Sequence, residues 1–85
     1  MATPWYLYLI ECADGSLYTG IAVDVAKRYS LHVSGKGAKY TRANGPVTLV
    51  YVSGSMTKSD ALKREIQIKG WTRAKKLRLI VGDWE

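Results

Sequence analysis

The fold of this chain is decided by the segment Trp5-Tyr6-Leu7-Tyr8-Leu9-Ile10 and by the turn that follows it. Because every position in this segment is aromatic or aliphatic, it predicts a β-strand that is covered on both faces. Asp14-Gly15 is a strong turn signal, and residues 16–21 are expected to return as the second strand of a hairpin. The hairpin is therefore the expected centre of the fold.

A third strand and three helices are expected around this hairpin. Residues 47–53 predict the strand, after the break at Gly45-Pro46. The helices are expected to start at the capping residues Asp24, Thr57 and Thr72 and to run to about Val33, Lys69 and Val81. The sequence thus predicts an α+β fold, with a small central three-stranded antiparallel sheet flanked by helices, and one domain over residues 1–85.

Positive charge is distributed unevenly along the chain. The 13 Lys and Arg residues outnumber the 7 Asp and Glu residues, which gives a net charge of +6. Residues 1–23 contain no Lys or Arg, so residues 24–85 carry all 13 basic side chains against 5 acidic ones, a net charge of +8. A compact basic surface attracts polyanions, nucleic acid first and an anionic membrane second. The alternative is a basic domain that binds no polyanion.

Composition excludes several other classes of protein. Hydrophobic residues make up 47% of the chain and charged residues 24%, which is typical of a globular domain. Cys12 is the single cysteine, so no intramolecular disulfide can form, and the reducing cytoplasm is the expected location. The early apolar run of six residues is too short to span a bilayer, so no membrane partner is expected.

Glu65 stands inside the apolar pattern of the helix that follows the third strand. The expected apolar stripe consists of Ala61, Leu62, Ile66 and Ile68. Because Glu65 lies four residues after Ala61 and three before Ile68, it shares their face of the helix. An ionised carboxylate is rarely buried without a partner. Glu65 therefore either pairs with a Lys or Arg at the edge of the stripe, or is a metal ligand or catalytic carboxylate in a groove.

Arg28 and His32 are four residues apart on the first helix, so they share one face. This face lies beside the expected apolar stripe of Val25, Tyr29 and Val33. A guanidinium followed by an imidazole can clamp a phosphate. The alternative is a pair of solvated polar side chains on the flank of the helix.

Tyr8 and Tyr18 lie on the two predicted strands of the hairpin. Gly20 leaves bare backbone beside Tyr18, as the close approach of another group requires. Aromatic residues in strands are most often core residues, which is the alternative to a role in a functional site. A phenol has a pKa near 10, so a tyrosine serves as a base near neutral pH only where a cation lowers that pKa.

A basic segment rich in glycine follows the first helix and contains, in order, Lys36, Lys39, Tyr40, Thr41 and Arg42. Cations, a hydroxyl and an aromatic ring in one loop suit contacts to a phosphate backbone with some base stacking. The spacing differs from that of a nucleotide-binding phosphate loop. The segment is therefore predicted to bind nucleic acid, with a solvated surface loop as the alternative.

Taken together, these residues resemble the GIY-YIG nuclease superfamily, and most closely its small stand-alone bacterial members, the YhbQ-like group. Tyr6-Leu7-Tyr8 corresponds to the first signature triplet and Tyr18-Thr19-Gly20 to the second, with the hairpin turn between them. Arg28 matches the helix arginine of the family, and Glu65 matches its distal glutamate. The resemblance covers residues 5–80.

The resemblance implies both the sheet-and-helix fold expected above and a reaction, the hydrolysis of phosphodiester bonds in DNA with a divalent metal, usually Mg²⁺. In that reaction Tyr8 would activate the attacking water as a base or its relay. Tyr18 would orient that water or help to bind the phosphate, and Arg28 would stabilise the charge that develops on it. Glu65 would hold the metal. His32 matches a histidine one turn after the arginine and would act as a proton relay or phosphate donor.

The sequence also departs from the family pattern. Tyr6, Leu7 and Thr19 replace the glycine and the two isoleucines of the signature, and the one asparagine, Asn44, comes too early to match the late asparagine of many catalytic members. The resemblance therefore predicts a DNA endonuclease of modest activity and low sequence specificity, acting on branched, nicked or single-stranded DNA in repair or recombination. The alternatives are a catalytically weak or inactive nucleic-acid-binding module on the same fold, and a small partner of a larger nucleoprotein complex.

Overall fold

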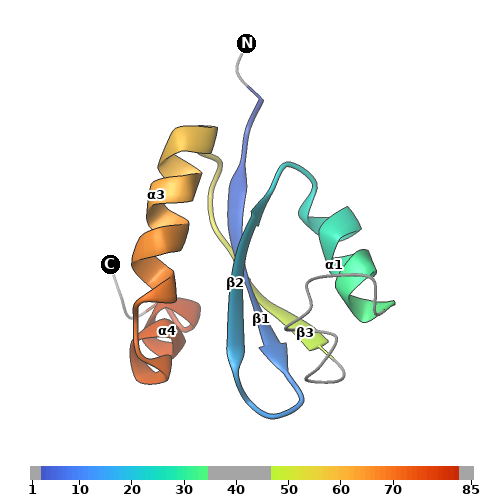
Figure 1. Cartoon of the computed structure of the whole chain (residues 1–85), viewed down its shortest axis with the longest axis vertical. Helices are drawn as coiled ribbons and strands as arrows, with labels where there is room; N and C mark the ends of the chain where they lie inside the picture. Colours follow the sequence, from blue (N-terminus) through green and yellow to red (C-terminus); the bar gives the residue numbers. More distant parts are fainter. Residues whose placement is uncertain (1–2, 35–46, 83–85) are drawn as a thin grey trace.

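The computed structural model describes residues 3–34 and 47–82, which form a three-stranded antiparallel sheet with helices on both faces (Figure 1). The elements follow in the order β1 (Tyr6–Cys12), β2 (Leu17–Ala22), α1 (Val25–Val33), β3 (Val47–Val52), α3 (Lys58–Lys69) and α4 (Arg73–Ile80). Each expected strand and helix is present, with ends close to the predicted ones. The predicted α+β fold is therefore confirmed.

The first strand lies in the middle of the sheet, in the strand order β2-β1-β3. Tyr8 of β1 stands opposite Gly20 of β2, and Leu9 stands opposite Thr19. The pairing of β1 with β3 is also antiparallel, and its register shifts between Leu9 and Ile10. Because β1 is hydrogen-bonded on both sides, β2 forms one edge of the sheet and β3 the other.

Alternate residues of β1 enter two separate cores. Leu7 and Leu9 pack against Ile68 of α3 and Leu79 of α4. On the opposite face, Tyr8, Ile10 and Ala22 form a second cluster that includes Val25 and Tyr29 of α1. Figure 1 shows the same arrangement, with α3 and α4 on one side of the sheet and α1 on the other. The expectation that this strand is covered on both faces is confirmed, and the reason is its central position.

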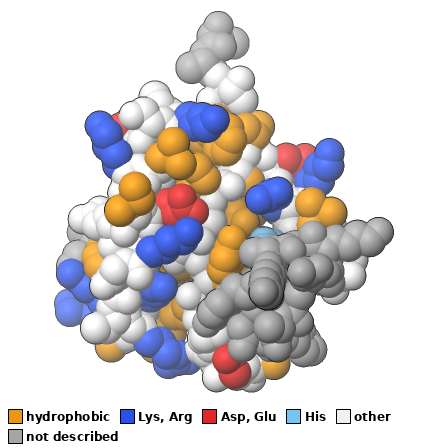
Figure 2. Space-filling model, viewed as in Figure 1, with side chains coloured by type: hydrophobic (Ala, Val, Ile, Leu, Met, Phe, Trp, Pro, Cys, Tyr) orange, Lys and Arg blue, Asp and Glu red, His pale blue; other side chains and the backbone are white. Residues whose placement is uncertain are grey.

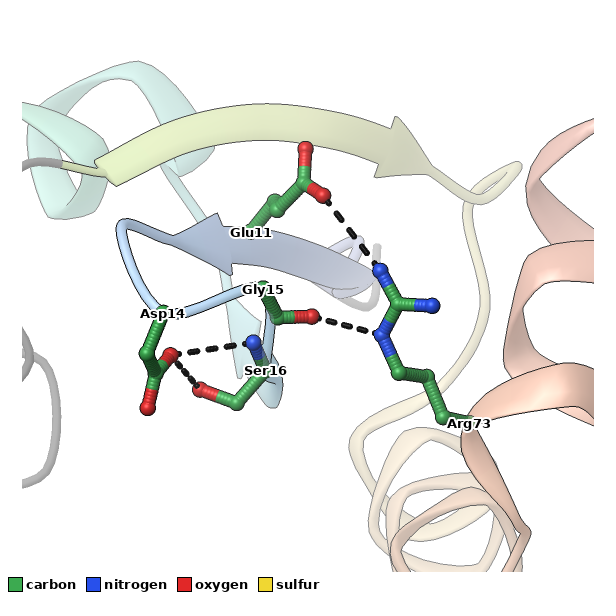
Figure 3. A network of polar contacts seen from close by, with 5 residues as sticks. All are labelled: Glu11, Asp14, Gly15, Ser16 and Arg73. Atoms are coloured by element: carbon green, nitrogen blue, oxygen red, sulfur yellow. Dashed lines mark hydrogen bonds and ion pairs between the residues drawn. The ribbon is translucent and has the colours of Figure 1, made fainter.

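The hairpin turn is attached to the last helix by Arg73 (Figure 3). The Asp14 carboxylate accepts hydrogen bonds from the backbone N–H and the hydroxyl of Ser16, at 3.0 and 2.6 Å, and Gly15 adopts a φ of 86°. Arg73 Nε donates to the Gly15 carbonyl at 2.6 Å, and Arg73 Nη2 lies 3.7 Å from Glu11 Oε2. These contacts fix the position of α4 at the tip of the hairpin.

The predicted capping residues start the three described helices. The side chain of Asp24 accepts from the Lys27 N–H at 3.0 Å. The Thr57 hydroxyl accepts from the Asp60 N–H at 3.1 Å, and Thr72 does the same for Lys75 N–H at 3.2 Å. Each cap satisfies a backbone donor that has no partner within its own helix, which is why short polar side chains mark these positions in the sequence.

The apolar stripe expected on α3 is wrong at two of its four positions. Ala61 and Ile68 are fully buried, but Leu62 is 42% exposed and Ile66 is 72% exposed. At about 100° per residue, Ala61, Glu65 and Ile68 lie within about 60° of one another, whereas Leu62 and Ile66 lie about 100° and 140° from Ala61. Only a narrow strip of the helix meets the sheet, and Glu65 lies within that strip.

Replacing Leu9 with alanine should lower the free energy of unfolding by about 2–5 kcal/mol, because Leu9 is fully buried in the core beneath α3 and α4. Urea denaturation followed by circular dichroism measures this loss. Ile66→Ala is the matched control, and should change the stability by less than about 0.5 kcal/mol because the side chain is exposed. Equal losses in the two variants would contradict the assignment of Leu9 to the core.

Candidate active site

Three aromatic rings from three different elements meet on the α1 side of the sheet. Tyr8 Oη lies 3.2 Å from His32 Nε2, within hydrogen-bond distance. The ring centroid of Tyr18 lies 6.4 Å from that of Tyr8 and 5.3 Å from that of His32. The imidazole is 5% exposed, so the alternative of a solvated side chain is wrong for His32. The structure thus brings three of the predicted site residues together.

The burial of His32 follows from the helical spacing of α1. Val25, Tyr29 and His32 are separated by four and three residues, so they share the face that packs on the sheet. Val33 was expected in this apolar stripe, but it is exposed at the end of the helix. The sequence pattern predicted that Val33 would be buried against the sheet, but His32 is buried there instead.

Gly20 determines where the Tyr8 hydroxyl lies. Tyr8 and Gly20 are paired across β1 and β2, and the phenol ring lies directly over the glycine backbone. A Cβ atom on residue 20 would stand 2.5 Å from Tyr8 Oη and 2.6 Å from its Cζ atom, which no real side chain tolerates. The close approach predicted at this glycine is confirmed, and the approaching group is the phenol of Tyr8.

The pKa of Tyr8 is raised above the ordinary value for a phenol. Burial is the largest cause, and the nearby Tyr18 adds to it. Arg28 lowers the pKa of Tyr8, first as a hydrogen-bond donor to the phenol and then by its positive charge, while the negative charge of Glu65 raises it. The Tyr8 hydroxyl is therefore protonated near neutral pH, and both Arg28 and Glu65 act on it electrostatically.

Burial has the opposite effect on His32. It lowers the pKa of the imidazole, and the positive charge of Arg28 lowers it further. The ring is therefore neutral near pH 7. A neutral imidazole has one nitrogen that donates and one that accepts, so Nε2 can accept a hydrogen bond from the Tyr8 hydroxyl.

Glu65 projects from the buried strip of α3, and its side chain is 17% exposed. Lys69 Nζ lies 3.3 Å from Glu65 Oε2. The predicted pairing of Glu65 with a basic residue is therefore confirmed. The spacing of four residues on one helix was the sequence signal for this specific partner. The lysine balances the charge of a carboxylate that is largely withdrawn from water.

Glu65 offers a metal ion a single carboxylate, and Mg²⁺ bound there would keep most of its own water. Residues 3–34 and 47–82 contain no group of three or more His, Cys, Asp or Glu side chains placed to hold a metal. Mg²⁺ is usually bound through one or two carboxylates, several waters and the phosphate oxygens of a substrate. Glu65 supplies one such carboxylate, on a side chain that is 17% exposed.

An open groove of about 420 Å³ lies beside Arg28, where β2 ends and α1 begins. Sequence reasoning missed the apolar walls of this groove, which include Trp5 and Leu31. Hydrophobic side chains gather near Lys and Arg side chains on the face that Figure 2 presents. The groove gives a ligand access to the guanidinium of Arg28, which is exposed.

Part of the predicted site cannot be placed, because it lies outside the described residues. This part comprises Lys36, Lys39, Tyr40, Thr41 and Arg42, the predicted nucleic-acid-binding segment. Asn44 also lies there. Among the described residues, no helix is both long and apolar enough to cross a membrane.

Replacing Gly20 with alanine should displace the Tyr8 ring and lower the free energy of unfolding by about 1–3 kcal/mol, because the new methyl group overlaps the phenol. The imidazole resonances of His32, the one histidine of the chain, should shift in the NMR spectrum as the hydrogen bond to Tyr8 lengthens. Gly54→Ala is the control, since a Cβ there has no neighbour within 4 Å. If both variants left the His32 signals unchanged, the close approach at Gly20 would be refuted.

The pH dependence of stability should reveal the buried His32. The unfolded chain protonates this histidine at a pKa of about 6.5, while the folded chain resists protonation because its pKa is lowered. The unfolded state therefore binds more protons in this window, and the free energy of unfolding should fall as the pH drops from about 6.5 toward the folded pKa. Chemical denaturation at several pH values measures this slope, and His32→Gln should remove it. A slope that persists in His32→Gln would have to come from another group.

Comparison with known proteins places the chain among its relatives. The family described as the GIY-YIG catalytic domain matches residues 4–78. A UPF0213 protein from Staphylococcus aureus (strain Mu3) is 57% identical over 75 residues, which cover 88% of this chain and 92% of the relative. The UPF0213 protein of Staphylococcus saprophyticus is 56% identical with the same coverage.

Two solved structures are similar to this one. The solution NMR structure of a UPF0213 protein from Bacillus halodurans has a TM-score of 0.58 and 45% sequence identity, covering 92% of this chain and 83% of that one. The solution NMR structure of a protein from E. faecalis has a TM-score of 0.63 and 36% identity, covering 93% of this chain and 84% of that one. This chain therefore belongs to the GIY-YIG family, within which its relatives are the UPF0213 proteins.

Proposed function

We propose that this protein is a metal-dependent endonuclease that hydrolyses phosphodiester bonds in DNA with low sequence specificity. The observation that carries the proposal is the hydrogen bond between Tyr8 and His32, made inside the sheet–helix interface with Arg28 beside it. A module that only bound DNA would not need a buried phenol–imidazole pair next to a guanidinium. The GIY-YIG family, a nuclease family, supports the same activity.

The substrate and setting of the reaction are part of the proposal. Branched, nicked or single-stranded DNA is the proposed substrate in preference to a defined recognition sequence, and repair or recombination in the cytoplasm would supply such DNA. The segment that contains Lys36, Lys39 and Arg42, with Tyr40 and Thr41, is proposed to grip the phosphate backbone. A larger nucleoprotein complex is a compatible partner.

In the proposed reaction, Tyr8 and His32 move one proton. Tyr8 Oη takes a proton from the attacking water while its own proton passes to His32 Nε2. The water oxygen bonds to phosphorus as the P–O bond to the leaving oxygen breaks, and the leaving oxygen takes a proton from solvent water. Because the pKa of Tyr8 is raised and that of His32 is lowered, both groups begin neutral near pH 7. The relay therefore needs no phenolate in the resting enzyme.

Arg28 and Tyr18 are proposed to act on the phosphate and the water. The exposed guanidinium of Arg28 would stabilise the negative charge that develops on the phosphate oxygens in the transition state. Tyr18 packs against the His32 ring, with the centroids 5.3 Å apart, so it holds the imidazole in place. Its hydroxyl would orient the attacking water or contact the phosphate.

Glu65 is proposed to hold the divalent metal, with Mg²⁺ as the expected ion. When bound, the ion would polarise the phosphate and neutralise part of its charge. Lys69 Nζ holds the carboxylate at 3.3 Å on the buried strip of α3, so the position of the carboxylate is set before a cation binds. Isothermal titration with Mg²⁺, without DNA, gives a readout of this role that does not depend on activity.

Tyr8→Phe should lower the rate of DNA nicking by about 10²–10⁴-fold, since it deletes the hydroxyl that relays the proton and keeps the ring. Nicking of supercoiled or branched DNA in Mg²⁺ is the measurement. In the wild type, kcat/KM should also fall as the pH drops through the lowered pKa of His32, because the protonated imidazole cannot accept a proton.

Tyr51→Phe is the matched control, because Tyr51 is a half-buried tyrosine of β3 in the other core. It should nick DNA at the wild-type rate, whereas Glu65→Gln should lose both nicking and Mg²⁺ binding. If the wild-type protein bound DNA but never nicked it, the alternative of an inactive nucleic-acid-binding module would hold instead. Full activity in Tyr8→Phe would show that Tyr8 is only a core aromatic.

A further inference from the structure

A second, basic pocket lies at the outer edge of β2, with a volume of about 320 Å³. It is lined by Leu17, Tyr18, Thr19, Lys69 and Lys76. Because β2 is an edge strand, this pocket is reached from outside the sheet. It adjoins the candidate active site, since Tyr18 lines it and Lys69 also contacts Glu65. The proposed chemistry uses neither Thr19 nor Lys76.

Among the described residues, Lys76 has no carboxylate as an ion-pair partner in this pocket. Its Nζ atom donates to the Leu17 carbonyl at 3.3 Å, and within residues 3–34 and 47–82 it forms no ion pair with a carboxylate. Burial lowers the pKa of Lys76, and the positive charge of Lys69 lowers it further. Two ammonium groups that repel each other at a partly buried site are both stabilised when an anion binds between them.

Thr19 supplies an independent sign of a ligand. The residue is 2% exposed, and its hydroxyl oxygen has no hydrogen-bond partner among the described residues. A buried hydroxyl without a partner destabilises a fold, so native proteins usually satisfy it with protein, water or ligand. Within residues 3–34 and 47–82, this hydroxyl is therefore a buried polar group that no protein atom satisfies.

We propose that this pocket binds a backbone phosphate of the DNA strand that is cleaved, at a position away from the scissile bond. Lys76 would supply the positive charge, Lys69, which is paired with Glu65, would line the same pocket, and Thr19 would supply a hydroxyl donor. The inference rests on the proposed function, because its ligand is a DNA phosphodiester. A lysine ammonium is a compact point charge that suits a phosphate approached from one side.

The position of the pocket determines how the strand would run. Tyr18 lies between the pocket and the Tyr8–His32 pair, so the DNA strand would cross the outer edge of β2 on its way to Arg28. Contacts to phosphate position a strand without reading its bases. The pocket would therefore hold the substrate in register while leaving the sequence specificity low.

The test measures binding of a fluorescein-labelled single-stranded oligonucleotide by anisotropy, in EDTA so that the strand stays intact. Lys76→Met should weaken binding and reduce the slope of log K against log salt by about 0.7, the value for one phosphate contact on a single strand. Lys63→Met, an exposed lysine of α3 outside the pocket, is the control for a general loss of charge. Equal slopes for wild type and Lys76→Met would overturn the proposal.

Thr19→Val separates a ligand contact from a structural role. It keeps the shape of the side chain and removes the unpartnered hydroxyl, so the melting temperature should stay the same or rise while affinity falls roughly 3- to 10-fold. A variant that melts earlier and binds DNA as the wild type does would show that the hydroxyl serves the fold, which overturns this part of the proposal.

A methylphosphonate scan identifies the phosphate and its source. One phosphate at a time is replaced with the neutral analogue. At the position that contacts the pocket, the replacement should weaken DNA binding by the wild type but cause no further loss of affinity in Lys76→Met. If inorganic phosphate perturbs the NMR signals of Lys76 but no scan position depends on Lys76, the pocket binds free phosphate and the proposal fails. A Lys76-dependent position in a protein that never nicks DNA would support the pocket and refute the nuclease. If the protein nicks DNA but no phosphate position depends on Lys76, the nuclease would be supported and the pocket refuted.

Discussion

The ring of Tyr8 lies across the backbone of Gly20, where a Cβ atom would stand 2.5 Å from the phenol oxygen. Because residue 20 has no side chain, the phenol crosses β2 and places its hydroxyl 3.2 Å from His32 Nε2. The same position brings the hydroxyl under the electrostatic influence of Arg28 and Glu65, which come from helices on opposite sides of the sheet. The Tyr8 hydroxyl is thus influenced by residues of four elements, β1, β2, α1 and α3, and it reaches this position because Gly20 has no side chain.

Burial has opposite consequences for the two groups that share this hydrogen bond. It raises the pKa of the Tyr8 phenol and lowers the pKa of the His32 imidazole, so each is held neutral near pH 7. Arg28 lowers both pKa values, which favours ionisation of the phenol and opposes protonation of the imidazole. The site therefore holds a neutral donor and a neutral acceptor next to a fixed positive charge. That combination suits transfer of a proton when an anionic phosphate approaches.

The three residues of the second signature triplet, Tyr18-Thr19-Gly20, have three different environments on one edge strand. Tyr18 packs with Tyr8 and His32 on the α1 side. Thr19 stands opposite Leu9, whose side chain enters the core beneath α3 and α4, and it lines the basic pocket. Gly20 provides the bare backbone under Tyr8. Since side chains alternate along a strand, one short segment serves both faces of the sheet.

The sequence by itself determined the elements of this protein and the family to which it belongs. Strand alternation, turn signals and helix caps act over a few residues, so Asp14-Gly15 and the caps at Asp24, Thr57 and Thr72 were sufficient to place the hairpin and the three described helices. The matching triplets, Arg28 and Glu65 indicated the nuclease family. Tertiary structure alone decided which side of each helix meets the sheet. It buried His32 in place of Val33, left Leu62 and Ile66 exposed, and brought Lys76 to Leu17 across 59 residues of sequence. The physical reason is that burial and pKa depend on neighbours distant in sequence, and a local pattern carries no information about how two distant elements dock.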